Sequence, residues 1–172
     1  MFPTCGINSY NFGRVLAQTV HYLWSYFKMT EKKEKVTFAL PIGAMGNIAA
    51  GHLAKICGLP IARFVGSVNI NDITHRVFSK GEFHIEEEMF KNLSEAINIQ
   101  APYNFERVLY WSSGIDFSYQ QPSSTYFQGN DSKLVKQMYL EFEKTGKMTI
   151  TGDLFKKLQD LCLTYRLGNS PW

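Results

Sequence analysis

The chain has 172 residues, enough for one domain with a buried core, and 45% of them are hydrophobic and 15% aromatic, which excludes an intrinsically disordered protein. Its net charge of +3 comes from 18 basic and 15 acidic residues that are interspersed along the chain, so no nucleic-acid-binding patch is indicated. Cys5, Cys57 and Cys162 are odd in number and far apart, which predicts neither a disulfide framework nor a metal site. The sequence shows no secretory or membrane segment, and we expect a cytoplasmic protein without a membrane partner.

The first predicted element is an amphipathic helix that starts near Ser9 or Asn11. Its periodic positions, three or four residues apart, are Phe12, Val15, Leu16, Thr19, Val20, Leu23 and Phe27. The further aromatic residues Tyr22, Trp24 and Tyr26 are interpreted as packing residues of this helix, because aromatic side chains on helices mostly serve packing.

A strand, a glycine turn and a second helix follow. The apolar run from Val36 to Leu40 predicts a buried strand, and Gly43 and Gly46 are expected to give the turn its positive φ angles. Asn47 stands where a helix cap is expected, and the helix that follows ends at Gly58.

This order of elements aims free backbone N–H groups and the positive end of a helix dipole at one point, an arrangement that binds phosphate. The candidate cofactor-binding residues are Gly43, Ala44, Met45, Gly46 and Asn47. The alternative is that the glycines only reverse the chain direction. The pattern lacks the Lys-Ser/Thr ending of a P-loop and is not G-x-G-x-x-G, so it predicts no nucleotide.

The run from Ile61 to Val68 predicts a second strand, parallel to the first because a helix joins the two. Asn71 or Asp72 is expected to cap a short helix that Gly81 ends. Asp72, His75 and Arg76 lie one helical turn apart, which suggests a second ligand site, although a cap with surface charges is the favoured interpretation.

Five more features are expected after Gly81. Ile85, Met89, Phe90, Leu93 and Ile97 predict a helix, with Glu86, Glu87 and Glu88 as a solvated face in its first turn. A helix with Phe105, Val108, Leu109 and Trp111 follows Pro102, and residues 112–131 read as a long loop. Two final helices carry Leu134, Val135, Met138, Tyr139 and Phe142, then Leu154, Leu158, Leu161 and Tyr165 after a cap at Thr151.

Five ordered blocks between about residues 7 and 110 resemble the threonine synthase family, especially its threonine synthase-like 2 members. These blocks are residues 7–14 (INSYNFGR), 40–51 (LPIGAMGNIAAG), 58–61 (GLPI), 69–76 (NINDITHR) and 102–107 (PYNFER). The resemblance implies a pyridoxal-phosphate-dependent enzyme of fold type II, whose loop amides, here those of residues 43–47, bind the cofactor phosphate. Ile42 departs from the threonine that is usual at its position in the family.

The implied fold class is α/β, a partial three-layer α/β/α arrangement with parallel strands, followed by helices. We expect residues 1–111 to form the phosphate-binding α/β segment, residues 112–131 a loop or insertion, and residues 132–172 a truncated helical segment. Chemistry with pyridoxal phosphate needs a lysine in a dry pocket, and none of the lysines has such a context. Lys28 follows Phe27 as in the family's Phe-Lys-Asp motif, but Met29 replaces the aspartate. In the family this lysine precedes the matched region, so no catalytic residue is predicted here.

The sequence leaves three hypotheses about function. The first is part of a phospho-lyase that converts the phosphorylated amino acids O-phosphohomoserine or O-phosphothreonine to 2-oxobutyrate, phosphate and ammonia, and that is inactive as this chain alone. The second is a non-catalytic truncated isoform that acts as an interaction or secreted signalling protein. The third, a nucleotide-binding domain, ranks last because residues 65–68 supply no acid for a ribose.

Overall fold

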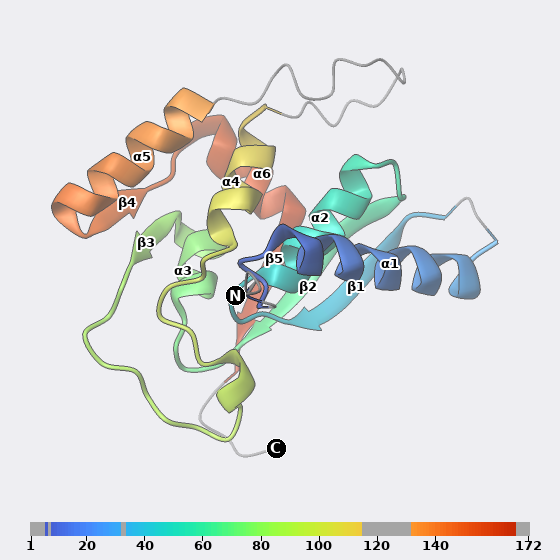
Figure 1. The fold of residues 1–172 in the computed structure, drawn as a ribbon, viewed down its shortest axis with the longest axis horizontal. Helices are drawn as coiled ribbons and strands as arrows, with labels where there is room; N and C mark the ends of the chain where they lie inside the picture. The colour runs from blue at the N-terminus through green and yellow to red at the C-terminus, as the bar shows by residue number, and fades with distance from the viewer. Residues whose placement is uncertain (1–5, 7, 32–33, 115–131, 168–172) are drawn as a thin grey trace, which may run out of the picture.

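The computed structural model describes residue 6 and residues 8–31, 34–114 and 132–167. Its central unit is a strand, a helix and a strand: β1 (Val36–Pro41), α2 (Gly46–Ile56) and β2 (Ile61–Val68). The two strands are parallel, with Phe38 beside Phe64, as the sequence predicts. A third parallel strand, β5 (Cys162–Arg166), pairs with the other edge of β2, so the sheet order is β1-β2-β5 (Figure 1).

Further helices pack around α2 and the sheet, and a short antiparallel pair of strands, distant from each other in sequence, lies beside α3 (Ile73–Lys80) and α5 (Ser132–Thr145). These further helices also include α1 (Phe12–Met29), α4 (Phe105–Gly114) and α6 (Gly152–Leu161). The antiparallel pair consists of β3 (Glu82–His84) and β4 (Lys147–Thr149), and a 3-10 turn, η1, spans Glu95–Ile97. The α/β class with a parallel sheet and these helices confirms the expected fold class.

Small residues of α2 let α1 and the sheet approach it closely. A Cβ atom at Gly51 would lie 2.6 Å from the ring of Phe64 and 2.8 Å from that of Tyr22. Tyr22 in turn packs edge-on against Phe38, with ring centroids 4.9 Å apart. The buried half of α1 therefore reaches the sheet past the backbone of α2, and Tyr22 and Tyr26 are packing residues as predicted.

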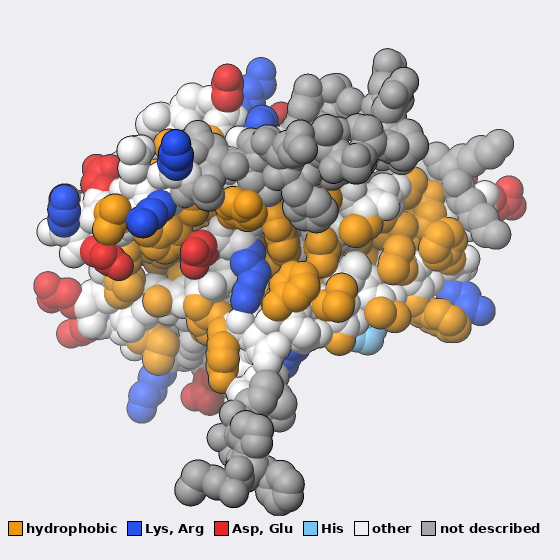
Figure 2. Space-filling model, turned by 45° about the horizontal axis from the view of Figure 1, so that its top comes forward, with side chains coloured by type: hydrophobic (Ala, Val, Ile, Leu, Met, Phe, Trp, Pro, Cys, Tyr) orange, Lys and Arg blue, Asp and Glu red, His pale blue; other side chains and the backbone are white. Residues whose placement is uncertain are grey.

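The outer face of α1 is also apolar, and it is exposed. The core stripe predicted for this helix is therefore wrong at most positions, because only Val15 and Thr19 of its seven residues are buried. Trp24, also predicted as a packing residue, is 65% exposed, in contrast to Tyr22 and Tyr26. Figure 2 shows hydrophobic side chains gathered on the face of the molecule where α1 lies. The exposed apolar side chains of this helix are Phe12, Leu16, Val20, Leu23, Trp24, Phe27 and Met29. No helix among the described residues is long and apolar enough to cross a membrane.

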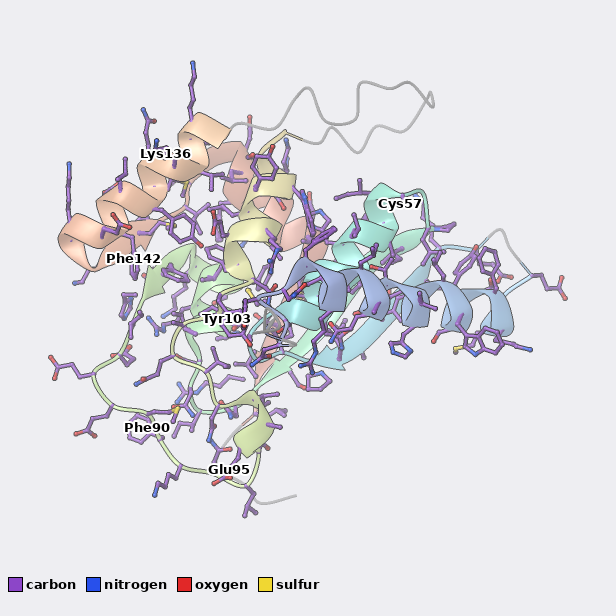
Figure 3. All side chains as sticks on the ribbon, in the orientation of Figure 1. Cys57, Phe90, Glu95, Tyr103, Lys136 and Phe142 are labelled. Atoms are coloured by element: carbon purple, nitrogen blue, oxygen red, sulfur yellow. The ribbon has the colours of Figure 1, made fainter. Side chains whose placement is uncertain are left out.

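The helix predicted from Ile85 to Ile97 is wrong. The segment follows β3 as irregular backbone that ends in the η1 turn, and Phe90 and Glu95 lie on this outlying loop (Figure 3). The apolar residues that suggested this helix have no tertiary packing that would stabilise it, since Met89 is 49% and Leu93 79% exposed.

Asparagine side chains hold this loop in its irregular path. The Asn71 side chain accepts a hydrogen bond from the Phe90 amide at 2.8 Å and donates one to the Phe90 carbonyl at 2.9 Å. The Asn98 Oδ1 atom accepts from the side chains of Asn69, Asn71 and Asn92 at 2.6, 2.8 and 2.7 Å. Such side-chain bonds compete with a helical ladder for the backbone groups, which explains why the apolar period alone misleads.

A second correction concerns the end of the last helix, which was predicted to include Tyr165. α6 begins after Thr151 as expected but stops at Leu161, and Tyr165 pairs with Ser67 in the sheet. The strand begins with Cys162, which is 1% exposed, and ends with a Thr-Tyr-Arg sequence whose first two residues favour strands. Of the predicted 112–131 loop, residues 112–114 belong to α4 and residues 115–131 lie outside the described residues.

The close approach at Gly51 predicts that Gly51→Ala destabilises the protein. The added methyl group overlaps two rings held by their own packing, so we expect a loss of about 1–3 kcal/mol in the free energy of unfolding. Urea denaturation measures this loss. Gly13→Ala in the first turn of α1 is the control, because it meets only the end of the Asn11 side chain and should be neutral or slightly stabilising.

Candidate functional site

The loop between β1 and α2 leaves a row of backbone amides without partners. Met45 is the N-cap of α2, and its side chain makes no capping hydrogen bond. Within the described part of the chain, no N–H group from Gly43 to Ile48 donates a hydrogen bond. A buried helix start without a cap is unusual, and in proteins such a set of amides serves to bind an anion.

These amides border a cleft of about 350 Å³. Its walls come from the loop, from α1 with the residues before it, and from the segment that leads into α4. The lining residues are Asn8, Ser9, Arg14, Gln18, Pro41, Ile42, Gly43, Ala44, Met45, Gly46, Asn47, Ile48, Ala96, Ile99 and Tyr103. Gln18 contributes a buried Oε1 atom without a hydrogen-bond partner among the described residues. The cleft thus collects free donors from the loop and one free acceptor from α1.

The conformation of the loop differs from the sequence prediction in one respect. Positive φ was expected at Gly43 and Gly46, but it occurs at Met45, with φ 62° and ψ 10°. The glycines are instead required by close packing. A Cβ atom at Gly43 would lie 3.1 Å from the Cα atom of Ile97, and one at Gly46 would lie 2.7 Å from the Cβ atom of Ser9.

Asn47 and Ile42 also have roles other than the expected ones. The Asn47 side chain does not cap α2, because its Oδ1 atom accepts a hydrogen bond from the Tyr22 hydroxyl at 2.7 Å. Burial raises the pKa of Tyr22 well above its ordinary value, so the hydroxyl stays a donor. Ile42, where the family has threonine, is 2% exposed, and a Cβ atom at Gly66 would lie 2.1 Å from its Cδ1 atom. Its side chain therefore packs in the core beside the sheet.

Sequence reasoning missed the residues that hold the loop from behind. Asn104 is fully buried, and its Nδ2 atom donates to the Ala44 carbonyl at 3.0 Å and to the Ser9 hydroxyl at 3.3 Å. Tyr103 adds a hydrogen bond from its hydroxyl to Asn8 at 3.2 Å, and Figure 3 shows it near the start of α1. No local pattern links residues about 95 positions apart, although both belong to blocks that resemble the family.

The second candidate site is only partly assembled. Asp72 binds Arg76 at 3.0 Å and Arg166 at 3.2 Å, beside a cavity of about 550 Å³. His75 instead bonds to Thr164 of β5 at 2.9 Å. The structure therefore joins two of the three predicted residues and separates the third. Because the two cations share the Asp72 carboxylate, this cluster is better explained as structural ion pairing.

Lysines and metal-ligand clusters do not contribute to the cleft. No lysine among the described residues lines it. Lys28 lies near the far end of α1, with its Nζ atom 4.9 Å from the centroid of the Trp24 ring. Among the described residues there is no group of three or more His, Cys, Asp or Glu side chains that could hold a metal ion.

Sequence comparisons relate the chain to threonine synthases and threonine synthase-like proteins. No family model matches the chain. It is 36% identical over 159 residues to human threonine synthase-like 2, which covers 90% of the chain and 30% of that protein. It is also 36% identical over 130 residues to threonine synthase of Saccharomyces cerevisiae, covering 71% of the chain and 25% of that protein.

Solved structures give the same result. The structure matches that of threonine synthase from Brucella melitensis with bound PLP, with a TM-score of 0.81 and 26% identity over 95% of this chain and 32% of that one. It matches the yeast threonine synthase structure with a TM-score of 0.78 and 30% identity over 94% of this chain and 31% of that one.

The fold is therefore that of pyridoxal-phosphate-dependent threonine synthases, over the part of that fold which the chain spans. Over 90% of its length the chain is similar to threonine synthase-like 2 proteins. It spans about 30% of the length of the curated relatives that it matches.

The contact between Gly46 and Ser9 yields a prediction that is independent of any ligand. Gly46→Ala should lower the free energy of unfolding of the ligand-free protein by about 1–3 kcal/mol, because the new methyl group would lie 2.7 Å from the Ser9 Cβ atom and 2.9 Å from its Oγ atom. Adding Ser9→Gly removes both atoms and should recover part of the loss. A double-mutant cycle by chemical denaturation measures the coupling. Strictly additive effects would show that this contact does not require the glycine.

Proposed function

We propose that the amides of residues 43–47 bind the phosphate group of pyridoxal phosphate. The observation that carries this proposal is the uncapped start of α2, whose free N–H groups border the cleft. The site residues are Gly43, Ala44, Met45, Gly46 and Asn47, each through its backbone amide. In such a site the backbone amides bind the phosphate and the side chains do not. The mixed side-chain chemistry of the loop is consistent with this.

The charge around the loop fits a dianion. The first turn of α2 contains no acidic residue, so only the positive end of the helix dipole faces the ligand. Arg14 also lines the cleft and adds a cation. A phosphate there would satisfy donors that otherwise remain without acceptors, at the favourable end of a helix that is itself fixed in the core.

The whole protein, we propose, is a phospho-lyase that acts on O-phosphohomoserine or O-phosphothreonine and releases 2-oxobutyrate, phosphate and ammonia. Similarity to threonine synthase-like 2 and threonine synthases supports this class. When bound, pyridoxal phosphate supplies an electron sink for bond cleavage next to the substrate amino group. The residues of this chain anchor and orient the phosphate, and the packed core of α2 keeps that anchor rigid. No lysine of the described residues lines the cleft for covalent attachment, and we expect these 172 residues alone to be inactive.

This expectation can be tested by chemical trapping. If the purified 172-residue chain is mixed with pyridoxal phosphate and reduced with borohydride, the pyridoxyl label should spread over several exposed lysines, because no described lysine lines the cleft. Peptide mapping by mass spectrometry gives the distribution. Stoichiometric labelling of a single lysine, Lys28 for example, would contradict the assignment of the site.

Asn47→Asp tests the phosphate assignment without disturbing the fold. The new carboxylate keeps an acceptor for the Tyr22 hydroxyl and lies in the first turn of α2, where a negative charge stabilises a helix by about 0.3–1 kcal/mol. The same charge repels a bound phosphate, and we expect the affinity for pyridoxine 5′-phosphate to fall about tenfold or more. Thermal melting and calorimetric titration on one sample measure both effects.

The matched control is Thr151→Asp, which adds the same charge at the start of α6, away from the cleft. It should leave the affinity unchanged, and pyridoxine without phosphate should bind every variant equally. If Asn47→Asp bound pyridoxine 5′-phosphate as tightly as the unmodified chain, the loop would be only a turn and the phosphate assignment would be wrong.

A further inference from the structure

Asn104 fixes the orientation of one peptide group in the loop. The Ala44 carbonyl accepts two hydrogen bonds from this residue, one from its Nδ2 atom at 3.0 Å and one from its backbone N–H at 3.2 Å. Asn104 is fully buried and does not line the cleft, so it faces the loop from the interior. Because a trans peptide is planar, its C=O and N–H point in opposite directions. The Met45 N–H is therefore turned away from Asn104.

The same peptide leads into the left-handed residue of the loop. Met45 has φ 62°, a conformation that costs a residue with a side chain free energy and persists only where its surroundings enforce it. Two constraints act on it. The Met45 side chain is 1% exposed and packs in the core, and the preceding carbonyl is held by Asn104.

Arg107 determines which way the Asn104 side chain faces. Its guanidinium donates hydrogen bonds to the Asn104 Oδ1 atom and to the carbonyls of Ser9, at 3.1 Å, and Tyr10. A guanidinium has only donors, so the carboxamide oxygen must face Arg107 and the NH₂ group is left for the Ala44 carbonyl. The orientation of the loop peptide thus depends on a chain of contacts that starts at α4.

We propose that Asn104 is a positioning residue for the phosphate site: it holds the Ala44–Met45 peptide so that Met45 stays left-handed and the amides of the α2 start face the cleft. The proposal rests on the phosphate-binding function proposed above and adds to it a residue that never touches the ligand. Removing the Asn104 side chain frees the peptide to turn over, since only the weaker backbone bond at 3.2 Å then holds the Ala44 carbonyl.

The test uses Asn104→Asp and Asn104→Ala in the 172-residue chain. Asn104→Asp keeps an oxygen for Arg107 and replaces the donor that faces the Ala44 carbonyl by an acceptor, with almost no change in volume. Two quantities are measured: the NMR Cα and Cβ shifts with the HN–Hα coupling of Met45, which report its φ angle, and the affinity for pyridoxine 5′-phosphate. We expect both variants to lose the left-handed values at Met45 and to bind about tenfold or more weakly, as expected when a charged acceptor loses a well-aligned donor.

Thr19→Val is the control for general destabilisation. Thr19 is buried and donates hydrogen bonds to the carbonyls of Val15 and Ala50, so its loss weakens the α1–α2 packing without touching the loop. It should lower the melting temperature and leave the Met45 values and the affinity unchanged. Equal changes in Thr19→Val and the Asn104 variants would reduce Asn104 to a stabilising residue and overturn the proposal.

The outcomes separate the two proposals. If the unmodified chain binds pyridoxine 5′-phosphate and both Asn104 variants bind it equally well with Met45 unchanged, the positioning role is wrong and the phosphate site stands. If the unmodified chain does not bind the ligand, the phosphate assignment fails. The NMR shifts and coupling of Met45 then test the role of Asn104 independently of the ligand. Unchanged shifts and coupling in both variants would overturn that role.

Discussion

Burial of α2 is the constraint on which the rest of the structure depends. This helix packs against both α1 and the sheet, and seven of its eleven residues are buried. The buried residues are Gly46, Ile48, Ala49, Ala50, Gly51, His52 and Ala54. Most are small, so neighbouring backbones come close and tolerate no added volume. The larger His52 fits because burial lowers its pKa to about 3, which keeps the ring neutral against the edge of Trp111. A helix packed in this way cannot shift, and its first turn is presented at a fixed place.

The proposed site follows from that rigidity. Three segments pack against the loop at the first turn of α2: the residues before α1, the outlying loop that ends in η1, and the residues that lead into α4. Ser9 touches Gly46, Asn104 binds the Ala44 carbonyl, and Ile97 closes against Gly43. The outlying loop that supplies Ile97 is tied to the end of β2 by the asparagine cluster around Asn98. The amides are thus set in place by contacts on their interior side, and the side facing the cleft is left for a ligand.

The sequence predicts the elements of this fold well wherever a local period decides the outcome. The strand from Ile61 to Val68 is predicted with the boundaries that the structure has, because Gly58 and Pro60 precede the run and the polar Asn69 follows it. The apolar period predicts a helix wrongly between Ile85 and Ile97, where hydrogen bonds between the Asn71 side chain and the Phe90 backbone compete with the helix. It fails again after Leu161, where pairing with β2 decides the state of the last residues.

In the candidate site, too, local sequence predicts some features and long-range contacts decide the others. The amides at the α2 start follow from the order of strand, turn and helix, and the sequence identifies them. The reason for each glycine does not follow, since it depends on Ser9 and Ile97, which are distant in sequence. The left-handed residue is Met45, a position that backbone preference alone would assign to glycine. Its conformation depends on Asn104, which is distant in sequence, so local sequence patterns do not predict it.

The distance along the chain between Ala44 and Asn104 has a consequence for biosynthesis. During translation the loop leaves the ribosome about sixty residues before Asn104 does, as the sequence separation of the bond to Ala44 shows. Contacts of such long range form late, after the local helices. A nascent chain therefore carries the sequence of the loop for some time without its final shape. Pyridoxal phosphate would meet a competent anchor only after α4 has docked, which delays loading of the cofactor until the surrounding core exists.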